Sequence, residues 1–303
     1  MQDTDICEEY DPMSIEQSSA FAIEYRLKAL NPKLHRRFTQ SVTALQYYLS
    51  RYKALFPKYT DHSELHCLSV IDYSNQLIGD QIRLLNADEL YVLLMACYLH
   101  DSGMGITMEM CREFSEKIDF GHYFDSHPRG NYPEVVRDFH HEYSGLFIRK
   151  YAQIFDIPSE AHVQAIAQTA RGHRRTNLKD EAEYPDSITM PGGNQLCLPY
   201  LAAVVRLADE IDVTASRNPL LLYDNDSLTD QKQIVLDKML KAVRSMDVTA
   251  EAFILHVETE EEEIRAKIQE MAEKIQTTLD YCRQVVRERT PYVITQQVVK
   301  TEM

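Results

Sequence analysis

The feature that most constrains the fold is an uninterrupted apolar segment that ends in two ionisable side chains. Residues 91–99 carry no charge, and the stretch 86–89, Asn-Ala-Asp-Glu, is typical of a helix N-cap with acids in the first turn. The pattern predicts a buried helix over 87–100 that carries His100 and Asp101 into the interior. A buried polar pair is costly unless hydrogen bonds, an ion pair or a metal ion satisfy it.

Most of the remaining sequence also favours helices. Apolar residues recur every three or four positions, strict alternation is rare, and the 303 residues include only 9 Gly and 11 Pro. We therefore predict a mainly α protein with three parts: a polar N-terminal arm over 1–20, a helical domain over 21–225, and a small α/β appendage over 226–303.

The appendage is predicted from its alternation of helix and strand patterns. Residues 229–246 and 260–289 have helical spacing, whereas 252–257 and 292–299 are strand candidates. Apolar positions from Ile264 to Val286 form a stripe along the second helix. The stripe could pair subunits into a homo-oligomer, but packing on the strands of its own unit is favoured.

Charge and cysteine usage limit the class of protein. The net charge of −15 argues against a broad nucleic-acid-binding surface and against an anionic membrane as partner. The six cysteines are scattered without a Cys-x-x-Cys pair, as in reduced proteins of the cytoplasm. The N-terminus lacks a signal-peptide pattern, and no apolar run is long enough for a membrane span, so we expect a cytoplasmic protein.

Histidines and aspartates follow several of the predicted helices in a fixed order. His62 and His66 share a helix face, but "HSELH" does not match the zinc-protease signature, in which Glu follows the first His. The later candidates lie in four places along the chain: His100-Asp101, His140-His141-Glu142, His173, and Asp209 at the end of an apolar helix.

Four segments carry a resemblance to a known group of enzymes. "HCLSVID", "LLMACYLHDSGMG", "HHEYSGLFI" and "VVRLADEID", over about 60–215, resemble the HD superfamily of metal-dependent phosphohydrolases. They also resemble its branch found beside chaperone-type ATPase domains. The resemblance implies a helical bundle around one or two divalent metal ions.

The same resemblance implies the ligands. One ion would be held by His66, His100, Asp101 and Asp209, with Asp101 as the bridge to a second ion. The second ion would use His173 and either His140 or His141, which the sequence does not separate. Imidazole and carboxylate ligands suit Mn, Fe, Mg, Ni, Co or Zn.

The implied reaction is the attack of a metal-activated water on phosphorus. Asp101, His141 and His173 are the predicted catalytic residues, and His62 and Glu142 are expected to support the ligands rather than to bind metal. A local basic cluster in the acidic chain is the predicted phosphate-binding site. It consists of Arg171, Arg174, Arg175 and Lys179.

The sequence predicts the type of reaction but leaves several classes of substrate open. Ser-Gly-Met-Gly after the doublet and Arg-Arg-Thr-Asn after His173 both differ from the cyclic-dinucleotide phosphodiesterases of the superfamily and argue against cyclic di-GMP. The "HHE" segment is similar to that of the deoxynucleoside triphosphate triphosphohydrolases, so a (deoxy)nucleoside triphosphate is favoured. The alternatives are a phosphodiesterase of cyclic or oligomeric nucleotides and a catalytically silent nucleotide-sensing module.

Overall fold

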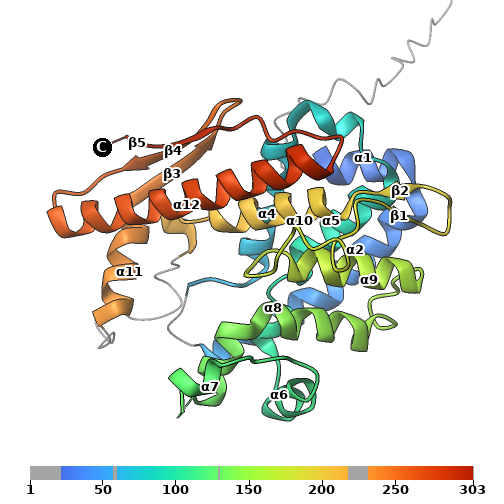
Figure 1. The fold of residues 1–303 in the computed structure, drawn as a ribbon, viewed down its shortest axis with the longest axis horizontal. Coiled ribbons are helices and arrows are strands. Elements are labelled where there is room, and N and C mark those ends of the chain that lie inside the picture. Colours follow the sequence, from blue (N-terminus) through green and yellow to red (C-terminus); the bar gives the residue numbers. More distant parts are fainter. Residues whose placement is uncertain (1–21, 57–59, 129, 218–230, 303) are drawn as a thin grey trace, which may run out of the picture.

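The computed structural model describes residues 22–56, 60–128, 130–217 and 231–302. Within them the chain is a helical bundle with a small C-terminal sheet, which confirms the predicted fold class (Figure 1). The predicted N-terminal arm and the predicted boundary near residue 225 lie outside the described residues.

The centre of the bundle is α5 (Ala87–Leu99), the helix predicted from the apolar segment. Its N-terminus has a capping box, in which the Asn86 side chain accepts the N–H groups of Asp88 and Glu89 while the Glu89 carboxylate accepts that of Asn86. From Leu90 to Leu99 every residue is buried. Burial on all sides follows from its neighbours, because five helices pack around α5: α1 (Ala22–Leu30), α2 (Pro32–Leu49), α4 (Glu64–Ile78), α9 (Glu160–Arg171) and α10 (Leu198–Glu210).

Helix α8 (Tyr132–Tyr151) lies against the turn that follows α5. Phe139 interrupts α8 with non-helical backbone angles (φ −115°, ψ 15°), one residue before His140. The turn is η2 (Ser102–Gly105), and a Cβ on Gly103 would lie 2.8 Å from the Ser144 nitrogen of α8 and closer still to the His140 carbonyl oxygen. Glycine at position 103 therefore lets the two segments that carry His100, Asp101 and His140 meet.

Short elements complete the bundle. They connect or flank the main helices and contribute less to its core. They are α3 (Tyr52–Leu55), η1 (Gly79–Arg83), α6 (Met108–Ser115), α7 (Tyr123–Ser126), β1 (Ile188–Thr189), β2 (Gln195–Leu196) and η3 (Ala215–Arg217).

The C-terminal part is an α/β unit whose boundaries differ from those predicted. The predicted helix over 229–246 is wrong at its end, because α11 (Gln231–Ala242) stops and β3 (Val243–Val248) pairs antiparallel with β4 (Ala252–Val257). The buried residues Val243 and Met246 are three positions apart, a spacing that also suits a helix, and the strand pairing shifts its register between Val243 and Ser245. The helical pattern therefore did not reveal the strand.

The last strand also begins later than predicted. Strand β5 (Val298–Glu302) pairs parallel with β4, whereas the predicted strand spanned 292–299. The preceding residues are held by other contacts: the Tyr292 hydroxyl donates to Glu89, and the Val293 N–H donates to the Gln81 side chain. Tyr292 and Val293 therefore contact the helical bundle, and the chain joins the sheet only at Val298.

Helix α12 (Glu262–Arg289) joins the sheet to the bundle. Its predicted apolar stripe is buried, from Ile264 to Val286, and Figure 1 shows the helix lying along α10. The ring of Tyr292 stacks on that of Tyr200 in α10, with the centroids 4.2 Å apart. Helix α12 thus packs within the same chain, against α10 of the bundle as well as β5, whereas the sequence favoured packing on the strands of its own unit.

Candidate metal centre

Two groups of histidine and aspartate side chains meet at the inner ends of the bundle helices. His66 lies in the first turn of α4, which Ser63 caps, while His100 and Asp101 follow the end of α5. Asp209 lies in the last turn of α10. Local sequence sets each position because each helix end is fixed by its own cap or turn.

The first group consists of His66, His100, Asp101 and Asp209. Nε2 of His66 lies 3.0 Å from Nε2 of His100. Oδ2 of Asp101 is 3.4 Å from the former and 3.3 Å from the latter, and Oδ1 of Asp209 is 3.3 Å from His66 Nε2 and 3.7 Å from His100 Nε2. All four residues predicted to hold one metal ion are therefore brought together.

The second group shares Asp101 with the first. Oδ1 of Asp101 lies 3.3 Å from Nε2 of His140 and 3.7 Å from Nε2 of His173, and these two nitrogens are 2.9 Å apart. One carboxylate thus offers Oδ2 to the first group and Oδ1 to the second. This is the arrangement expected of a carboxylate that bridges two cations.

The structure separates His140 from His141, which the sequence left open. His141 is buried but belongs to neither group, and its Nε2 lies 3.6 Å from Glu142 Oε1. Among the described atoms, its Nδ1 has no hydrogen-bond partner. The kink at Phe139 directs His140 to the Asp101 carboxylate. Helix periodicity alone does not indicate which of two adjacent residues faces the site.

The hydrogen bonds of the four histidines determine where their protons lie. Nδ1 of His100 donates to the Cys97 carbonyl oxygen at 2.8 Å, and Nδ1 of His173 donates to that of Ala170 at 2.6 Å. Nδ1 of His140 faces the carbonyl oxygen of Arg137 at 2.6 Å in the same way. A carbonyl oxygen accepts only, so each Nε2 of a neutral ring is left with its lone pair.

Facing lone pairs make the two groups suitable for cations. Nε2 atoms 2.9 to 3.0 Å apart repel one another unless a proton or a metal ion lies with them. Burial lowers the pKa of His140 well below its usual range and that of His173 to about 4, so a metal ion suits the second group better than a proton. The residues present therefore fit divalent metal ions.

Residues around the groups hold the candidate ligands in place. Asp212 accepts the Nδ1–H of His66 at 2.6 Å, and His62 donates from Nδ1 to Asp101 Oδ2 at 2.7 Å. Arg217 lies 3.7 Å from Asp209 Oδ1 and 3.6 Å from Asp212 Oδ2. His62 thus supports a ligand, as expected from the sequence, whereas Asp212 and Arg217 were missed.

A signal for Asp212 was present in the sequence, and none was present for Arg217. Asp212 follows Asp209 by three residues in "LADEID", a spacing at which two side chains at a helix end can face the same site. Arg217 reaches the site from η3, beyond the end of α10, and its position depends on a turn that no pattern announced.

The predicted basic cluster divides into two pairs. Arg171 donates to Glu142 at 2.6 Å and lies 3.2 Å from Glu183, and Lys179 lies over the ring of Tyr281. Arg174 and Arg175 instead line a cleft of about 590 Å³ beside His173. Glu142, which we expected to support the ligands, contacts both His141 and Arg171.

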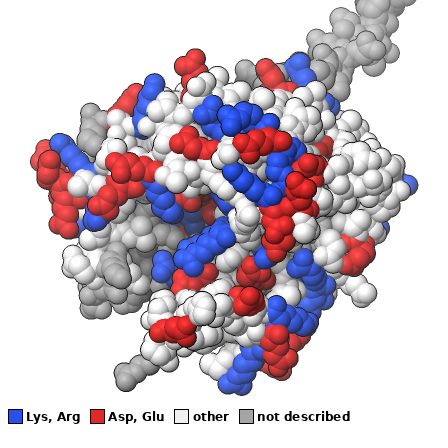
Figure 2. All heavy atoms as spheres, viewed as in Figure 1, with Lys and Arg blue, Asp and Glu red and all other residues white. Residues whose placement is uncertain are grey.

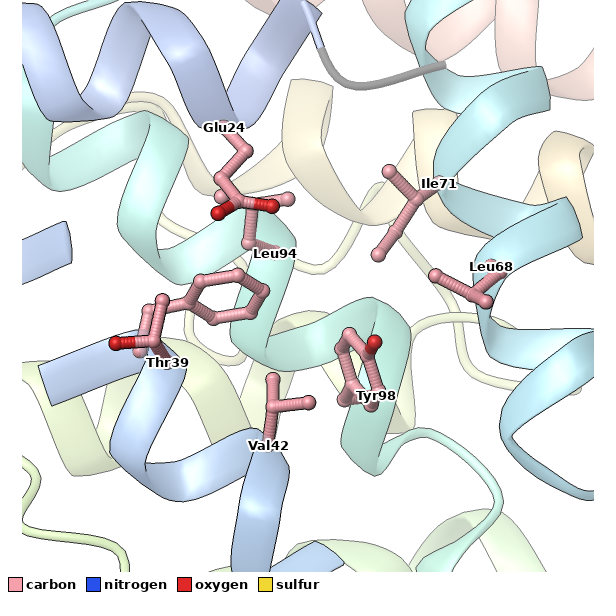
Figure 3. A pocket seen from close by; sticks show the side chains of 8 residues that line it. Glu24, Thr39, Val42, Leu68, Ile71, Leu94 and Tyr98 are labelled. Carbon is pink, nitrogen blue, oxygen red and sulfur yellow. The ribbon is translucent and has the colours of Figure 1, made fainter. Parts of the chain in front are cut away.

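A second cavity lies away from these groups. It measures about 200 Å³, and Figure 3 shows Leu68, Leu94 and Tyr98 around it, with Glu24 at one side. Glu24 accepts a hydrogen bond from His35 at 2.8 Å. None of the predicted site residues lines this cavity, so we do not assign the chemistry to it.

A family model described as HD-CE matches residues 56–292, which is most of the chain. The chain belongs to the HD-CE family. The matched range contains every residue of both groups as well as α12. Searches of curated proteins and of solved structures found no significant match. Together, the family and the clustered ligands point to a metal-dependent hydrolase.

Among the helices in the described part of the chain, none combines the length and the apolar character needed to cross a bilayer.

Proposed function

We propose that this protein is a phosphohydrolase that uses one or two divalent metal ions to cleave a nucleotide phosphoester or phosphoanhydride. A (deoxy)nucleoside triphosphate is the proposed substrate. The observation that supports this most strongly is the position of Asp101, whose two oxygens face two separate groups of buried imidazoles. Such a pair of groups suits phosphoryl transfer, in which charge develops on both the attacking and the leaving oxygen.

In this proposal one ion is held by His66, His100, Asp101 and Asp209, and the other by Asp101, His140 and His173. Metal ions bound there would acidify water and neutralise charge on phosphoryl oxygens. The chain itself orients the ligands, because each histidine is fixed through its Nδ1 and the Asp101 carboxylate is held by His62. Mn, Fe, Mg, Ni, Co and Zn all suit these ligands.

Arg174 and Arg175 are the proposed phosphate-binding residues. Both line the cleft that adjoins His173, and Arg175 has 56% of its side chain exposed. Arginine can grip phosphate oxygens through two N–H groups at once. A phosphate binding role for Arg171 and Lys179, and a catalytic role for His141, stay predictions.

We also propose that the protein belongs to the branch found beside chaperone-type ATPase domains, forms a homo-oligomer and is located in the cytoplasm. Two other functions also remain as alternatives: a phosphodiesterase of cyclic or oligomeric nucleotides, and a nucleotide-sensing module without turnover. An intact ligand set favours an enzyme over a sensor, because a binding module does not need every ligand.

The test measures metal content and phosphate release on the same samples. The wild type, Asp101→Asn and the control Asp72→Asn are assayed in Mn²⁺ with nucleoside triphosphates, deoxynucleoside triphosphates and cyclic nucleotides. Asp72 is a carboxylate of α4 outside both groups, hydrogen-bonded to Gln76. We expect turnover of one substrate class that Asp101→Asn abolishes and Asp72→Asn retains. Metal without turnover would favour the sensor, and absence of both would refute the proposal.

A further inference from the structure

The cleft beside the metal centre is lined by distant parts of the chain. One wall is the turn after α9, with His173, Arg174 and Arg175, and another is α12. Arg206 and Glu210 of α10 also line the cleft. His173 also belongs to the second group of candidate ligands, so the cleft opens directly beside that group. Figure 2 shows basic side chains gathered around a hollow near the middle of this face, beside the position of α12 in Figure 1.

One face of α12 lines this cleft over two turns. Lys274, Thr277, Thr278 and Tyr281 are spaced by three and four residues, as expected for neighbours on a single helix face. The adjacent face carries the buried apolar stripe that packs on the bundle. The helix is therefore held rigidly by one face while the other presents polar groups to the cleft.

The charge of the cleft is opposite to that of the whole chain. Its lining includes four cationic side chains and a single carboxylate, Glu210, in a protein with a net charge of −15. Glu210 is paired with Lys274 at 2.7 Å. Arg175 lies 4.0 Å from Asp138, at the limit of an ion pair. A local excess of cations beside a candidate hydrolytic centre suits an anionic ligand.

The size of the cleft and the composition of its lining suit a ligand with more than one phosphate group. A volume of about 590 Å³ is much larger than one phosphate needs, and only His173 of its lining belongs to the metal centre. Lys274, the cation of α12 in this lining, therefore lies where a ligand that extends away from the metal centre would pass.

We propose that α12 forms the second wall of the substrate cleft. Lys274, Thr277 and Thr278, together with Arg174 and Arg175, bind a phosphate group other than the one that is cleaved. The ligand is accordingly a phosphate ester or anhydride with at least two phosphate groups. The inference rests on the proposed function for its substrate, and it makes the C-terminal unit part of the site.

The experiment uses inorganic tripolyphosphate and orthophosphate as probes, with Mg²⁺ in excess, and measures binding to the full chain by calorimetry. Lys274→Ala is compared with Lys267→Ala, a lysine on the same helix that is paired with Glu270 at 2.7 Å and does not line the cleft. We expect Lys274→Ala and Arg175→Ala to weaken tripolyphosphate binding about tenfold, and orthophosphate binding to change little. Lys274→Arg keeps the charge and should bind nearly as the wild type does.

The outcomes separate the cleft from the proposed reaction. Equal tripolyphosphate affinities in Lys274→Ala and Lys267→Ala would overturn the role of α12, even if the protein hydrolyses a nucleotide. A selective loss in Lys274→Ala, restored by Lys274→Arg, supports the role of α12. If that loss occurs while no nucleotide is hydrolysed, the cleft is upheld as a phosphate site and the proposed function fails.

Discussion

At the scale of single residues, the candidate centre depends on which nitrogen of each histidine carries its proton. Backbone carbonyls accept the Nδ1–H groups of His100, His140 and His173, so the Nε2 lone pairs of these three rings lie close to Asp101 and to neighbouring Nε2 atoms, while Asp212 accepts the Nδ1–H of His66. This arrangement is unfavourable for an empty polar cluster and favourable for cations. Of the adjacent residues His140 and His141, only His140 belongs to this arrangement.

His140 and His141 should differ in metal binding. His140→Asn removes an Nε2 that lies 3.3 Å from Asp101, whereas His141→Asn changes a ring outside both groups. We expect His140→Asn to lower the bound metal by about one ion per chain and His141→Asn to leave it unchanged. Elemental analysis of the purified proteins measures this, with circular dichroism to check folding. Equal metal loss in both variants would contradict the assignment.

Asp212 should influence metal binding through His66. Asp212→Ala removes the acceptor of the His66 Nδ1–H, 2.6 Å away, and frees the ring to turn. We expect metal affinity to fall about 10- to 100-fold, as for other residues that orient a ligand. Asp212→Asn keeps an acceptor and should show a smaller loss. Competition with a chelator measures the affinities, and unchanged affinity in Asp212→Ala would show that His66 needs no such support.

At the scale of elements, the centre is built where helix ends meet. The end of α5, the first turn of α4, the last turn of α10 and the kink of α8 each supply one part of it. One close approach of backbones joins two of these parts: η2 packs against α8 at Gly103, where an added Cβ would overlap the α8 backbone.

Gly103→Ala should disturb that contact. The new methyl group would overlap the α8 backbone at His140 and Ser144, so we expect a loss of about 1 to 3 kcal/mol in the free energy of unfolding and weaker metal binding. Gly192→Ala is the control, because nothing lies within 4 Å of its added Cβ. Urea unfolding measures both variants. A Gly103→Ala protein as stable as Gly192→Ala would show that α8 can move without cost.

A carboxylate between helices should give a pH-dependent contribution to stability. The hydrogen bond from His162 of α9, 2.8 Å away, holds the pKa of Asp88 in α5 below its ordinary value of 3.8. The contribution is therefore present above the pKa of the unfolded chain and is lost as pH falls through that of the folded state.

We expect Asp88→Asn to lower the free energy of unfolding near neutral pH by about 1 kcal/mol, and the difference from the wild type to shrink below about pH 4. Urea unfolding of both proteins between neutral and acidic pH measures the difference. A difference that is constant over this range would contradict a role for the Asp88 charge.

At the scale of the whole molecule, the C-terminal unit and the bundle should unfold together. The apolar face of α12 packs on α10, and the Tyr292 hydroxyl donates to the buried Glu89 at the start of α5. The family match, which continues from the bundle to residue 292, agrees with a joint unit. The predicted division into two domains near residue 225 stays a prediction, which thermal unfolding can test.

Calorimetry of Tyr292→Phe provides that test. Removing the hydroxyl leaves the Glu89 carboxylate with fewer donors, so we expect one unfolding transition at a lower temperature, with a loss of about 1 to 2 kcal/mol. Tyr47→Phe is the matched control, since Tyr47 is 81% exposed. Two separate transitions, of which Tyr292→Phe shifts only one, would show that the parts fold independently.

The sequence by itself determined the helical class and the buried helix α5, because caps and apolar periodicity are local features of the chain. The histidines and aspartates of the site were implied by the resemblance to the HD superfamily, which left His140 and His141 open. The strand boundaries near 243 and 298 were not predictable in this way, because pairing with β4 and contacts with the bundle outweighed local preference.

Only the tertiary structure decided how the site is completed. The kink at Phe139 separates His140 from His141, η3 brings Arg217 to Asp209, and α12 faces the arginines that follow His173. His140 meets Asp101, and α12 faces Arg174 and Arg175, across long stretches of the sequence, whereas the position of Arg217 depends on the turn η3. The spacing of residues along one helix carries no information about such contacts.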